Sequence, residues 1–464
     1  MRYFKLYMLV LYWGGVFAQN RQNEEVLKTF TEVMRMPSVS GNERRLAQYL
    51  LQKTHEMGFY TRTFPDKDSF INFSASVYPL EQNKPNIIFL CHLDVVPAPD
   101  SLQWKHPPFA GVIANDTLWG RGCLDMKGIG VMEIFAMQGF LDSAKKTNLP
   151  YNLTLLFVSD EEKGGVHGAK FTIDNYLTVL RPKLVIGEGG GGFKKLLPSK
   201  PNKLVFFVSV AEKKSLWLKL SVNCHANGHG AMPSNETANS ILLKAINRVE
   251  EKKPIIIFDR VTKKMFKELG KSNGGFKGFL LRNINKFWLR PVRRSILRKE
   301  PLLMSEVTST TQLTNIYNPA EPPNVIPNEA AAYFDCRLLP GVSTKKFIRR
   351  LKLKILNPKV KIEIIDQSAT AKPTRDGNTF NIIEGSLKKV YPACDALPVL
   401  FPATTDNSFF RSVSVPSFGI LPLELSQELV KTVHGTNECI PVPVIYKGIE
   451  AYKIIMNDLL RSEK

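Results

Sequence analysis

The 464-residue sequence lacks several features that would each assign it to a class of protein. It has only six cysteines, and Cys91, Cys123, Cys224 and Cys336 lie in apolar or motif-rich segments. This placement argues against a disulfide framework and favours small buried residues. Beyond the amino-terminal stretch, no apolar run is long enough to cross a bilayer, and no repeat or low-complexity tract stands out. The composition, 44% hydrophobic and 23% charged, predicts a folded globular chain of two domains.

The apolar run near the amino terminus is typical of a secretory signal peptide over residues 1–18. Arg2 and Lys5 form its basic region, residues 6–17 its apolar region, and Ala18 ends a suitable cleavage site. An uncleaved membrane anchor is disfavoured because this run is short for a full span. We therefore expect a mature protein that is soluble and secreted, or otherwise outside the cytoplasm.

Acidic residues are scarce relative to basic ones. The chain has 63 Lys and Arg against 42 Asp and Glu, a formal charge of +21. The excess is concentrated in residues 251–300, where 15 basic residues face 4 acidic ones and aromatic residues are interleaved. No nucleic-acid-binding motif is present there, so we expect no nucleic-acid partner. Two interpretations stay open: a basic amphipathic element that contacts a membrane surface or a lipid-like ligand, or a solvated helical face.

The first part of the mature chain alternates helical and strand-like segments. Helical spacing covers residues 23–36, 42–59, 128–146 and 168–180. Short apolar runs that end in polar or glycine-rich turns, as buried parallel strands do, cover residues 86–96, 151–159 and 183–187. This alternation predicts an α/β fold with a mostly parallel sheet, in which functional residues lie at the carboxyl ends of the strands.

The pattern changes at about Ser209. A strand, a helix, two strands, a helix and a strand follow, interrupted by the basic stretch, and this order predicts a small open α+β sandwich inserted into the larger domain. The predicted organisation is a signal peptide at 1–18, the larger domain at 19–208 and 372–464, and the inserted domain at 209–371.

Histidine and carboxylate residues gather at the predicted strand ends and in loops. They are His92, Asp94, Asp125, Glu161, Glu162, Glu188 and His434. His92 and Asp94 share one face of an extended segment, and Asp125 opens a helix. Imidazole and carboxylate groups bind zinc or a similar divalent ion. The number of these groups exceeds what one tetrahedral ion needs and suits two metals that share a bridging carboxylate, with a water between them.

In this order the motifs resemble a known family, the dinuclear-zinc metallopeptidases that include glutamate carboxypeptidase, aminoacylase, succinyl-diaminopimelate desuccinylase and carboxypeptidase S. The resemblance covers nearly the whole mature chain. Its motifs are HLDVVP, GRGCLDMKG, SDEE, GEGG, GHGAMP, PPNVIPNEAAAYFDCRLLPG and HGTNE. The long basic insertion looks most similar to the branch of carboxypeptidase S and the N-fatty-acyl-amino-acid hydrolases.

The resemblance implies a dinuclear zinc-hydrolase catalytic domain, with other divalent ions as alternatives. His92 and Glu188 would hold one zinc and Glu162 and His434 the other, with Asp125 as the bridge. The inserted domain would be a lid and dimerisation domain, which implies a homodimer.

The resemblance also assigns the neighbours of these ligands. Asp94 would hydrogen-bond the ring of His92 and fix its orientation. Glu161 would be the general base, which takes a proton from the water between the metals and delivers it to the leaving amine. Asp160 is left without a role in the chemistry, and we expect it to hold the turn by hydrogen bonds.

Three residues of the inserted domain match family positions that meet the substrate. His229 would stabilise the oxyanion, often from the partner subunit, and a capped turn histidine is the alternative. Asn324 and Arg337 would bind substrate, with Arg337 on its free carboxylate. A surface strand arginine is the alternative for Arg337. The segment 402–410 resembles a loop that meets the same carboxylate.

One motif departs from the family pattern. Many relatives of the carboxypeptidase S type have an aspartate where this chain has Gly187, so Glu188 is the local carboxylate that serves the metal. Four consecutive glycines, residues 189–192, predict an unusually flexible loop.

The sequence therefore predicts an exported zinc amidohydrolase that acts on N-acyl amino acids or small peptides with a free C-terminal carboxylate. A dipeptidase or exocarboxypeptidase without acyl preference is the first alternative. A non-catalytic binding protein of the same fold is disfavoured because the base and all five ligand positions are occupied. Membrane or polyanion binding through residues 251–300 would be an added property.

Overall fold

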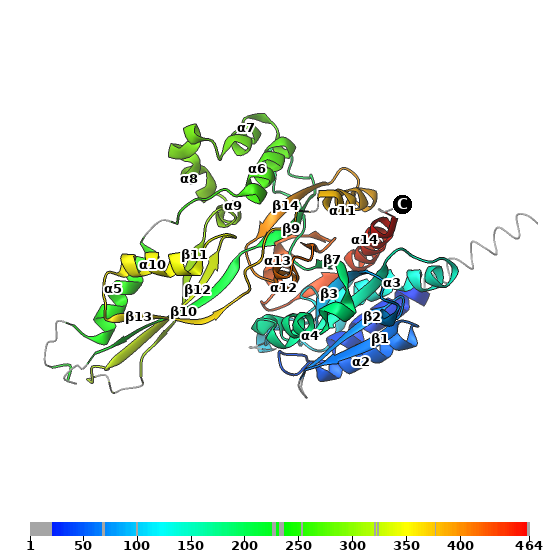
Figure 1. Cartoon of the computed structure of the whole chain (residues 1–464), viewed down its shortest axis with the longest axis horizontal. Coiled ribbons are helices and arrows are strands. Elements are labelled where there is room, and N and C mark those ends of the chain that lie inside the picture. The colour runs from blue at the N-terminus through cyan, green and yellow to red at the C-terminus, as the bar shows by residue number, and fades with distance from the viewer. Residues whose placement is uncertain are drawn as a thin grey trace, which may run out of the picture. The chain divides into compact units, whose positions relative to one another are not determined.

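The computed structural model describes residues 21–66, 70–98, 101–224, 229–231, 236–251, 254–319, 322, 324–375 and 377–461 (Figure 1). The predicted signal peptide lies outside these residues. The chain forms two compact units, one of residues 1–208, 375–397 and 415–464, the other of residues 209–374 and 398–414. Residues 398–414, predicted to be part of the larger domain, thus belong to the second unit. Within the described ranges, no helix has the length and apolar character that a membrane span requires.

The first unit is built on a mixed, mostly parallel sheet. Among the described residues this sheet has ten strands, in the order β1-β2-β6-β3-β7-β15-β9-β8-β16, with β14 paired to β9. Its parallel centre consists of β6 (Asn152–Val158), β3 (Asn86–His92), β7 (Pro182–Gly187) and β15 (Ser417–Gly419). Every residue of β3 and β6 is buried, which explains why these strands are continuous apolar runs in the sequence.

Further strands flank this centre, and two of them, β9 and β14, begin in the first unit and end in the second. They are β1 (Tyr60–Pro65), β2 (Ile71–Ser76), β8 (Gly191–Phe193), β9 (Val205–Glu212), β14 (Asp395–Phe401) and β16 (Glu424–Leu425). A separate small sheet is formed by β4 (Val112–Ala114), β5 (Thr117–Trp119) and β17 (Cys439–Pro441).

Among the helices of the first unit, α14 (Val442–Arg461) packs on both α3 (Lys127–Lys146) and α11 (Gly377–Val390). Residues 21–34 are also helical. The remaining helices are α2 (Arg44–Glu56), α4 (Phe171–Leu180) and α13 (Gln427–Thr432). Helix α14 buries a face at helical spacing that includes Ile445, Tyr452 and Ile455, as a helix on the core must.

The glycine run after β7 is held by close packing, contrary to the predicted loop flexibility. A Cβ atom at Gly190 would lie 2.1 Å from the carbonyl oxygen of Phe207, and one at Gly192 would lie 2.6 Å from the ring of Phe206. Side chains at these two positions would collide with the neighbouring strand. The glycines therefore permit β8 and the segment between β7 and β8 to approach β9, and Glu188 leaves the sheet from a packed segment.

The second unit contains a four-stranded antiparallel sheet in the order β11-β12-β10-β13. Its strands are β10 (Lys214–Asn223), β11 (Thr310–Tyr317), β12 (Glu329–Leu338) and β13 (Val360–Gln367). Alternate residues of β10 and β12 form one core with α5 (Ala238–Glu250) and α10 (Thr344–Ile355). Two helices on one face of an antiparallel sheet make the small α+β sandwich, so the predicted fold class is confirmed.

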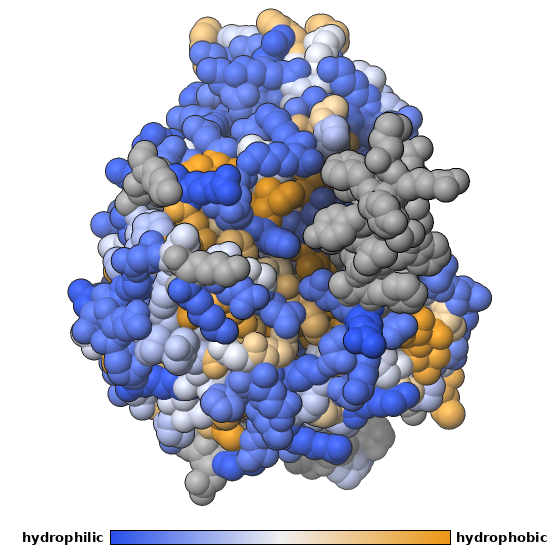
Figure 2. All heavy atoms as spheres, turned by 90° about the vertical axis from the view of Figure 1, so that its right-hand side faces the viewer, coloured by the Kyte–Doolittle hydropathy of each residue, from blue (hydrophilic) through white to orange (hydrophobic). Residues whose placement is uncertain are grey.

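The basic stretch of the second unit is helical. It contains α6 (Arg260–Asn273), α7 (Gly275–Asn283), the 3-10 turn η5 (Phe287–Leu289), α8 (Arg290–Arg298) and α9 (Pro301–Ser305). A short helix, α12 (Asn407–Ser412), belongs to the same unit. On the face of the molecule shown in Figure 2, hydrophilic residues predominate and hydrophobic residues occur in scattered groups.

Candidate metal centre

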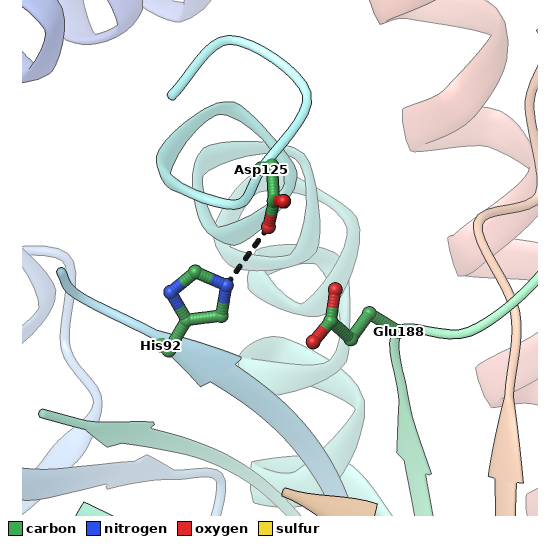
Figure 3. Close-up of side chains that lie close together, drawn as sticks. All are labelled: His92, Asp125 and Glu188. Atoms are coloured by element: carbon green, nitrogen blue, oxygen red, sulfur yellow. Dashed lines mark hydrogen bonds and ion pairs between the residues drawn. The ribbon is translucent and has the colours of Figure 1, made fainter. Parts of the chain in front are cut away.

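Five predicted ligands of the first unit lie together in two groups. His92, Asp125 and Glu188 form one group, and Asp125, Glu162 and His434 form the other. In each group the ligand atoms lie within 4.8 Å of one another. Figure 3 shows the first group, with side chains that point toward one another from the end of β3, the turn before α3 and the end of β7. The carboxyl ends of parallel strands thus supply this site, as the fold predicts.

His92 is the most buried of these ligands. It is the last residue of β3, and only 2% of it is exposed. Its Nε2 atom lies 2.9 Å from Oδ1 of Asp125. Burial lowers the pKa of His92, but its hydrogen bonds to Asp125 and Asp94 outweigh that effect and hold the pKa well above its usual range.

Asp125 presents one oxygen to each histidine. Its Oδ1 faces His92, and its Oδ2 lies 3.0 Å from Nε2 of His434. Burial raises the pKa of Asp125, but the hydrogen bonds to His434 and His92 are stronger and hold it below its usual range. A carboxylate whose two oxygens face different imidazole nitrogens has the arrangement that a bridging metal ligand requires.

His434 completes the second group from a loop. Its Nε2 atom also lies 3.1 Å from Oε1 of Glu162. The hydrogen bonds to Asp125 and Glu162 raise its pKa to about 10 although partial burial lowers it. About half of this side chain, 52%, is exposed, so solvent reaches the second group at His434.

Asp94 is fully buried and organises the acidic turn. Its Oδ1 and Oδ2 atoms accept the backbone N–H groups of Glu161 and Glu162, both at 3.0 Å, and Oδ2 also accepts the hydroxyl of Ser40 at 2.7 Å. The ring of His92 meets Asp94 mainly through the backbone, because Nδ1 lies 2.9 Å from its carbonyl oxygen and 3.4 Å from Oδ1. Asp94 therefore fixes both the first histidine and the turn that carries Glu161 and Glu162.

The turn SDEEKGG begins directly after β6. Asp160 has a left-handed backbone conformation, with φ of 68°. Its Oδ2 atom accepts the N–H group of His167 at 3.2 Å, and its carbonyl oxygen accepts the N–H group of Gly165 at 2.6 Å. Its predicted role as a structural hydrogen-bonding residue is confirmed, and Glu161 and Glu162 start the short helix that follows.

Glu438 holds the backbone at Asp125 by hydrogen bonds, a role that was not predicted from the sequence. The residue is fully buried. Its Oε1 atom accepts the N–H groups of Leu124 and Asp125 at 2.9 and 3.3 Å, and Oε2 accepts Gly122 N–H at 2.9 Å and Arg121 Nη1 at 2.7 Å. The sequence feature that could have indicated this role is the position of Glu438, four residues after His434 in the motif HGTNE. Glu438 thereby ties the loop of His434 to the loop of Asp125.

Glu43 is a second supporting residue that the sequence analysis missed. It is fully buried at the start of α2, and its Oε1 atom accepts Gly41 N–H at 2.9 Å. Burial raises the pKa of Glu43 to about 7, the charge of Asp94 adds to the rise, and backbone N–H groups, among them that of Asp160, oppose it. In mildly acidic solution, the carboxyl group of Glu43 beside the acidic turn is therefore neutral.

The donor set fits two divalent ions. Each group combines one imidazole with carboxylates, the mixture that zinc binds. Both histidines present the same ring atom, Nε2, to the shared Asp125. Metals at these positions would take the places of the direct imidazole–carboxylate hydrogen bonds, and the neighbouring carboxylates would gain the counter-charge that their proximity calls for.

The three predicted substrate residues lie in the second unit. Gly230 N–H donates to the carbonyl oxygen of Asn324 at 2.7 Å, beside a β-bridge between His229 and Val325, so His229 and Asn324 lie on adjacent segments. His229 is exposed. Arg337 lies apart from them on β12.

The guanidinium of Arg337 is partly engaged. Its Nε atom donates to both carboxylate oxygens of Asp335, at 2.9 and 3.1 Å, and Nη1 lies 3.5 Å from the hydroxyl of Thr404. Its Nη2 atom has no acceptor among the residues that the structure describes.

Known proteins share this chain's sequence pattern. The model of the peptidase family M20/M25/M40 matches residues 88–458. The probable carboxypeptidase S-like protein 2 of Dictyostelium discoideum is 29% identical over 420 residues, which cover 86% of this chain and 78% of that protein. The N-fatty-acyl-amino acid synthase/hydrolase PM20D1 of Mus musculus is 28% identical over 379 residues, 79% of this chain and 73% of that protein.

A solved structure shares the fold. The M20 family metallo-carboxypeptidase Sso-CP2 of Sulfolobus solfataricus aligns with a TM-score of 0.70 at 20% identity, over 94% of this chain and 99% of that chain. The family match covers most of the sequence, so the resemblance that the motifs predicted is confirmed. The chain belongs to the M20/M25/M40 peptidase family and is a metallo-hydrolase of that family.

Proposed function

We propose that this protein hydrolyses the amide bond of N-acyl amino acids, or of small peptides with a free C-terminal carboxylate, with two zinc ions as cofactors. The observation that carries the proposal is the position of Asp125, whose two oxygens face His92 and His434 while its neighbours are further carboxylates.

Five residues would hold the ions. His92 and Glu188 would bind one zinc, Glu162 and His434 the other, and Asp125 would bridge the two. When bound, the ions would lower the pKa of a water molecule and polarise the scissile carbonyl group. Other divalent ions can use the same donor set.

Glu161 is the proposed general base. It accepts a proton from the attacking water and later delivers that proton to the leaving amine. Asp94 positions it, because its carboxylate holds the backbone N–H groups of Glu161 and Glu162. Adjacent residues of one short turn thus take different tasks, with Glu162 at the ions and Glu161 at the water.

The proposed substrate carboxylate binds to Arg337, whose Nη2 atom is available among the described residues. A guanidinium and a carboxylate form short, charge-assisted hydrogen bonds. Asp335 holds the Nε side of the same group and orients it. His229 and Asn324, on adjacent segments, complete the proposed substrate contacts, with His229 at the oxyanion.

A hydrophobic acyl group is the favoured substituent on the nitrogen. The motivation is the similarity to an N-fatty-acyl-amino acid synthase/hydrolase together with the aromatic, basic insertion. A dipeptidase without acyl preference is the alternative, and the relative rates on dipeptides and on long-chain acyl amino acids separate the two.

The proposal includes a homodimer and export. The outer strands β11 and β13 of the second unit are mostly exposed, which supports pairing of two copies there. Light scattering of the purified protein tests the dimer. Export rests on the predicted signal peptide, and a mature amino terminus after residue 18, read by mass spectrometry of the secreted chain, tests it.

The test of the reaction compares Glu161→Gln with the surface control Glu56→Gln. Purified variants are assayed on N-acyl amino acids and dipeptides, and their metal content is measured. We expect Glu161→Gln to lower turnover by about a hundredfold to ten-thousandfold with metal content unchanged, and the control to match wild type. Loss of metal in Glu161→Gln would mean that Glu161 is the metal ligand and Glu162 the general base. Activity that survives complete metal removal would overturn the mechanism.

A further inference from the structure

Residues 275–299 carry positive charge without any negative charge. This segment of 25 residues contains eight basic residues and no Asp or Glu. It forms α7, η5 and α8 of the second unit, seen at the top of Figure 1. The basic residues are Lys277, Arg282, Lys286, Arg290, Arg293, Arg294, Arg298 and Lys299. We call the exposed part of these three elements the α7–α8 surface.

The α7–α8 surface exposes aromatic rings. Phe276 and Phe287 are 75% and 77% exposed, and Phe279 and Trp288 are 44% and 45% exposed. The rings of Phe279 and Trp288 stack with their centroids 6.0 Å apart, which joins α7 to η5. Four large rings therefore stand in solvent over a short stretch of chain, although burial of each would be favourable.

The exposure does not come from loose attachment of the segment. Ile284, Leu289 and Leu297 are buried, so aliphatic residues anchor it to the unit. A Cβ atom on Gly278 would lie 2.4 Å from the carbonyl oxygen of Gly270, so α7 packs closely on α6 at Gly278. At 100° per residue, Phe276 lies about 160° around the helix from Gly278, and its ring faces away from α6.

The charges of the α7–α8 surface are uncompensated. None of the eight basic side chains forms an ion pair with a carboxylate among the residues that the structure describes. Arg294 donates instead to the carbonyl oxygen of Pro254 at 2.7 Å, and the guanidinium of Arg293 lies over the ring of Phe258 at 5.8 Å. By contrast, Lys271 on α6 pairs with Glu268 at 2.9 Å.

We propose that the α7–α8 surface docks on an anionic lipid membrane. Exposed aromatic rings insert at the level of the headgroups, and Lys and Arg side chains bind the lipid phosphates. The chemistry of the surface favours a membrane over a single-stranded nucleic acid. Val292 is 47% exposed and adds aliphatic surface that cannot stack on a base, and Phe279 and Trp288 stack on each other. The proposal is independent of the proposed reaction.

The experiment uses the full mature chain with lipid vesicles. Co-sedimentation is measured with vesicles of phosphatidylcholine alone and with an equal mixture of phosphatidylserine and phosphatidylcholine, each at low and high salt. Wild type is expected to bind the anionic vesicles, more weakly at high salt, and to bind the neutral vesicles far less.

Three variants locate the contact. Lys277→Gln/Lys286→Gln/Arg290→Gln is expected to weaken binding about a hundredfold, since each charge contributes about tenfold or less at an anionic surface. Phe276→Ser/Phe287→Ser is expected to weaken it about tenfold or more. The matched control Lys345→Gln/Lys346→Gln/Arg349→Gln removes the same charges from the exposed face of α10 and is expected to bind as wild type. Thermal denaturation shows that each variant is folded.

Three results would overturn the proposal. Wild type that does not bind anionic vesicles excludes it directly. An equal loss of binding in the α10 control means that net charge, rather than this surface, is responsible. Binding to a single-stranded oligonucleotide that the α7–α8 variants abolish, without vesicle binding, assigns the surface to nucleic acid instead.

Discussion

The two ligand groups share Asp125 but differ in their surroundings. The group of His92 lies at the end of a fully buried strand, and His92 is 2% exposed. The group of His434 takes that residue from a loop, in a left-handed conformation with φ of 60°, and 52% of the side chain is exposed. The histidine of one group is therefore fixed by the sheet, and the histidine of the other is exposed to solvent. If both proposed ions bind, we expect the ion at the group of His92 to be held more tightly than the ion at the group of His434.

Both groups depend on buried carboxylates that are not themselves among the predicted metal ligands. Glu438 holds the backbone of Asp125, and Asp94 holds the backbone of Glu162. Each accepts several N–H groups, so loss of either would release a loop rather than a single contact. These hydrogen bonds fix the positions of Asp125 and Glu162 relative to each other.

The largest expected effect follows from the shared residue. Asp125→Asn removes the negative charge that both groups use, so we expect both metals to be lost and turnover to fall by more than about a thousandfold. Metal analysis and amidohydrolase assays measure this, with Asp142→Asn on the exposed surface as the control. A variant that keeps one full equivalent of metal would show that one group binds metal without Asp125, which would contradict the shared role of this residue.

The fold was predictable where strands have a clear apolar or alternating pattern and was not where they are very short or lack such a pattern. The run NIIFLCH marks β3 because both of its faces are covered. Strand β1 alternates poorly and is largely exposed, so its pairing with β2 depends on tertiary contacts that no local pattern reports. Strands of three residues, such as β4, β5 and β17, are too short for a periodicity.

The site was predictable for residues whose side-chain chemistry and sequence motif indicate metal binding. His92 and Asp125 stand in polar motifs next to apolar runs, and the family resemblance joined them to the distant His434. Glu438 and Glu43 bind backbone N–H groups, and the positions of backbone groups follow only from the folded chain. The sequence therefore predicted the ligands better than their supports.

The next effect compares the two histidines directly. In the metal-free protein, His92→Ala removes the buried imidazole that pairs with Asp125 and Asp94, and it should lower the free energy of unfolding by about 3 kcal/mol. His434→Ala should lower it by less, because half of the His434 side chain is exposed and solvent screens its ion pairs. Denaturant titration measures both, and metal analysis should find one ion retained in His434→Ala. Equal destabilisation by the two variants would contradict the distinction between the buried and the exposed histidine.

A smaller effect concerns pH. In the metal-free protein, Asp125 and Glu162 raise the pKa of His434 to about 10. Below that pH an ion at the group of His434 must displace a proton, so its affinity should rise about tenfold for each pH unit between about pH 6 and pH 8. Competition with a fluorescent chelator measures the affinity, and titrations in buffers of different ionisation enthalpy count the protons released. Affinity that stays constant over this range would show that His434 is neutral before the metal binds.

The last prediction tests the buried carboxyl group next to the acidic turn. The pKa of Glu43 is about 7 in the folded protein, above its ordinary value of 4.5. A raised pKa makes the folded state bind the extra proton, so this contribution to stability is complete below about pH 4.5 and is lost as pH rises through about 7. Glu43→Gln keeps an oxygen for Gly41 N–H and cannot ionise.

The stability advantage of Glu43→Gln over wild type should therefore grow by about 3 kcal/mol from about pH 4.5 to about pH 8. Denaturation midpoints at several pH values measure this, with Glu56→Gln as the control. The Oε2 atom of Glu43 has no hydrogen-bond partner among the described residues, so the amide group can occupy its place. A difference that does not change with pH would mean that Glu43 is already ionised beside Asp94. The surroundings of His92 would then tolerate a second negative charge beside Asp94. The tighter metal binding expected at the group of His92 would need another cause.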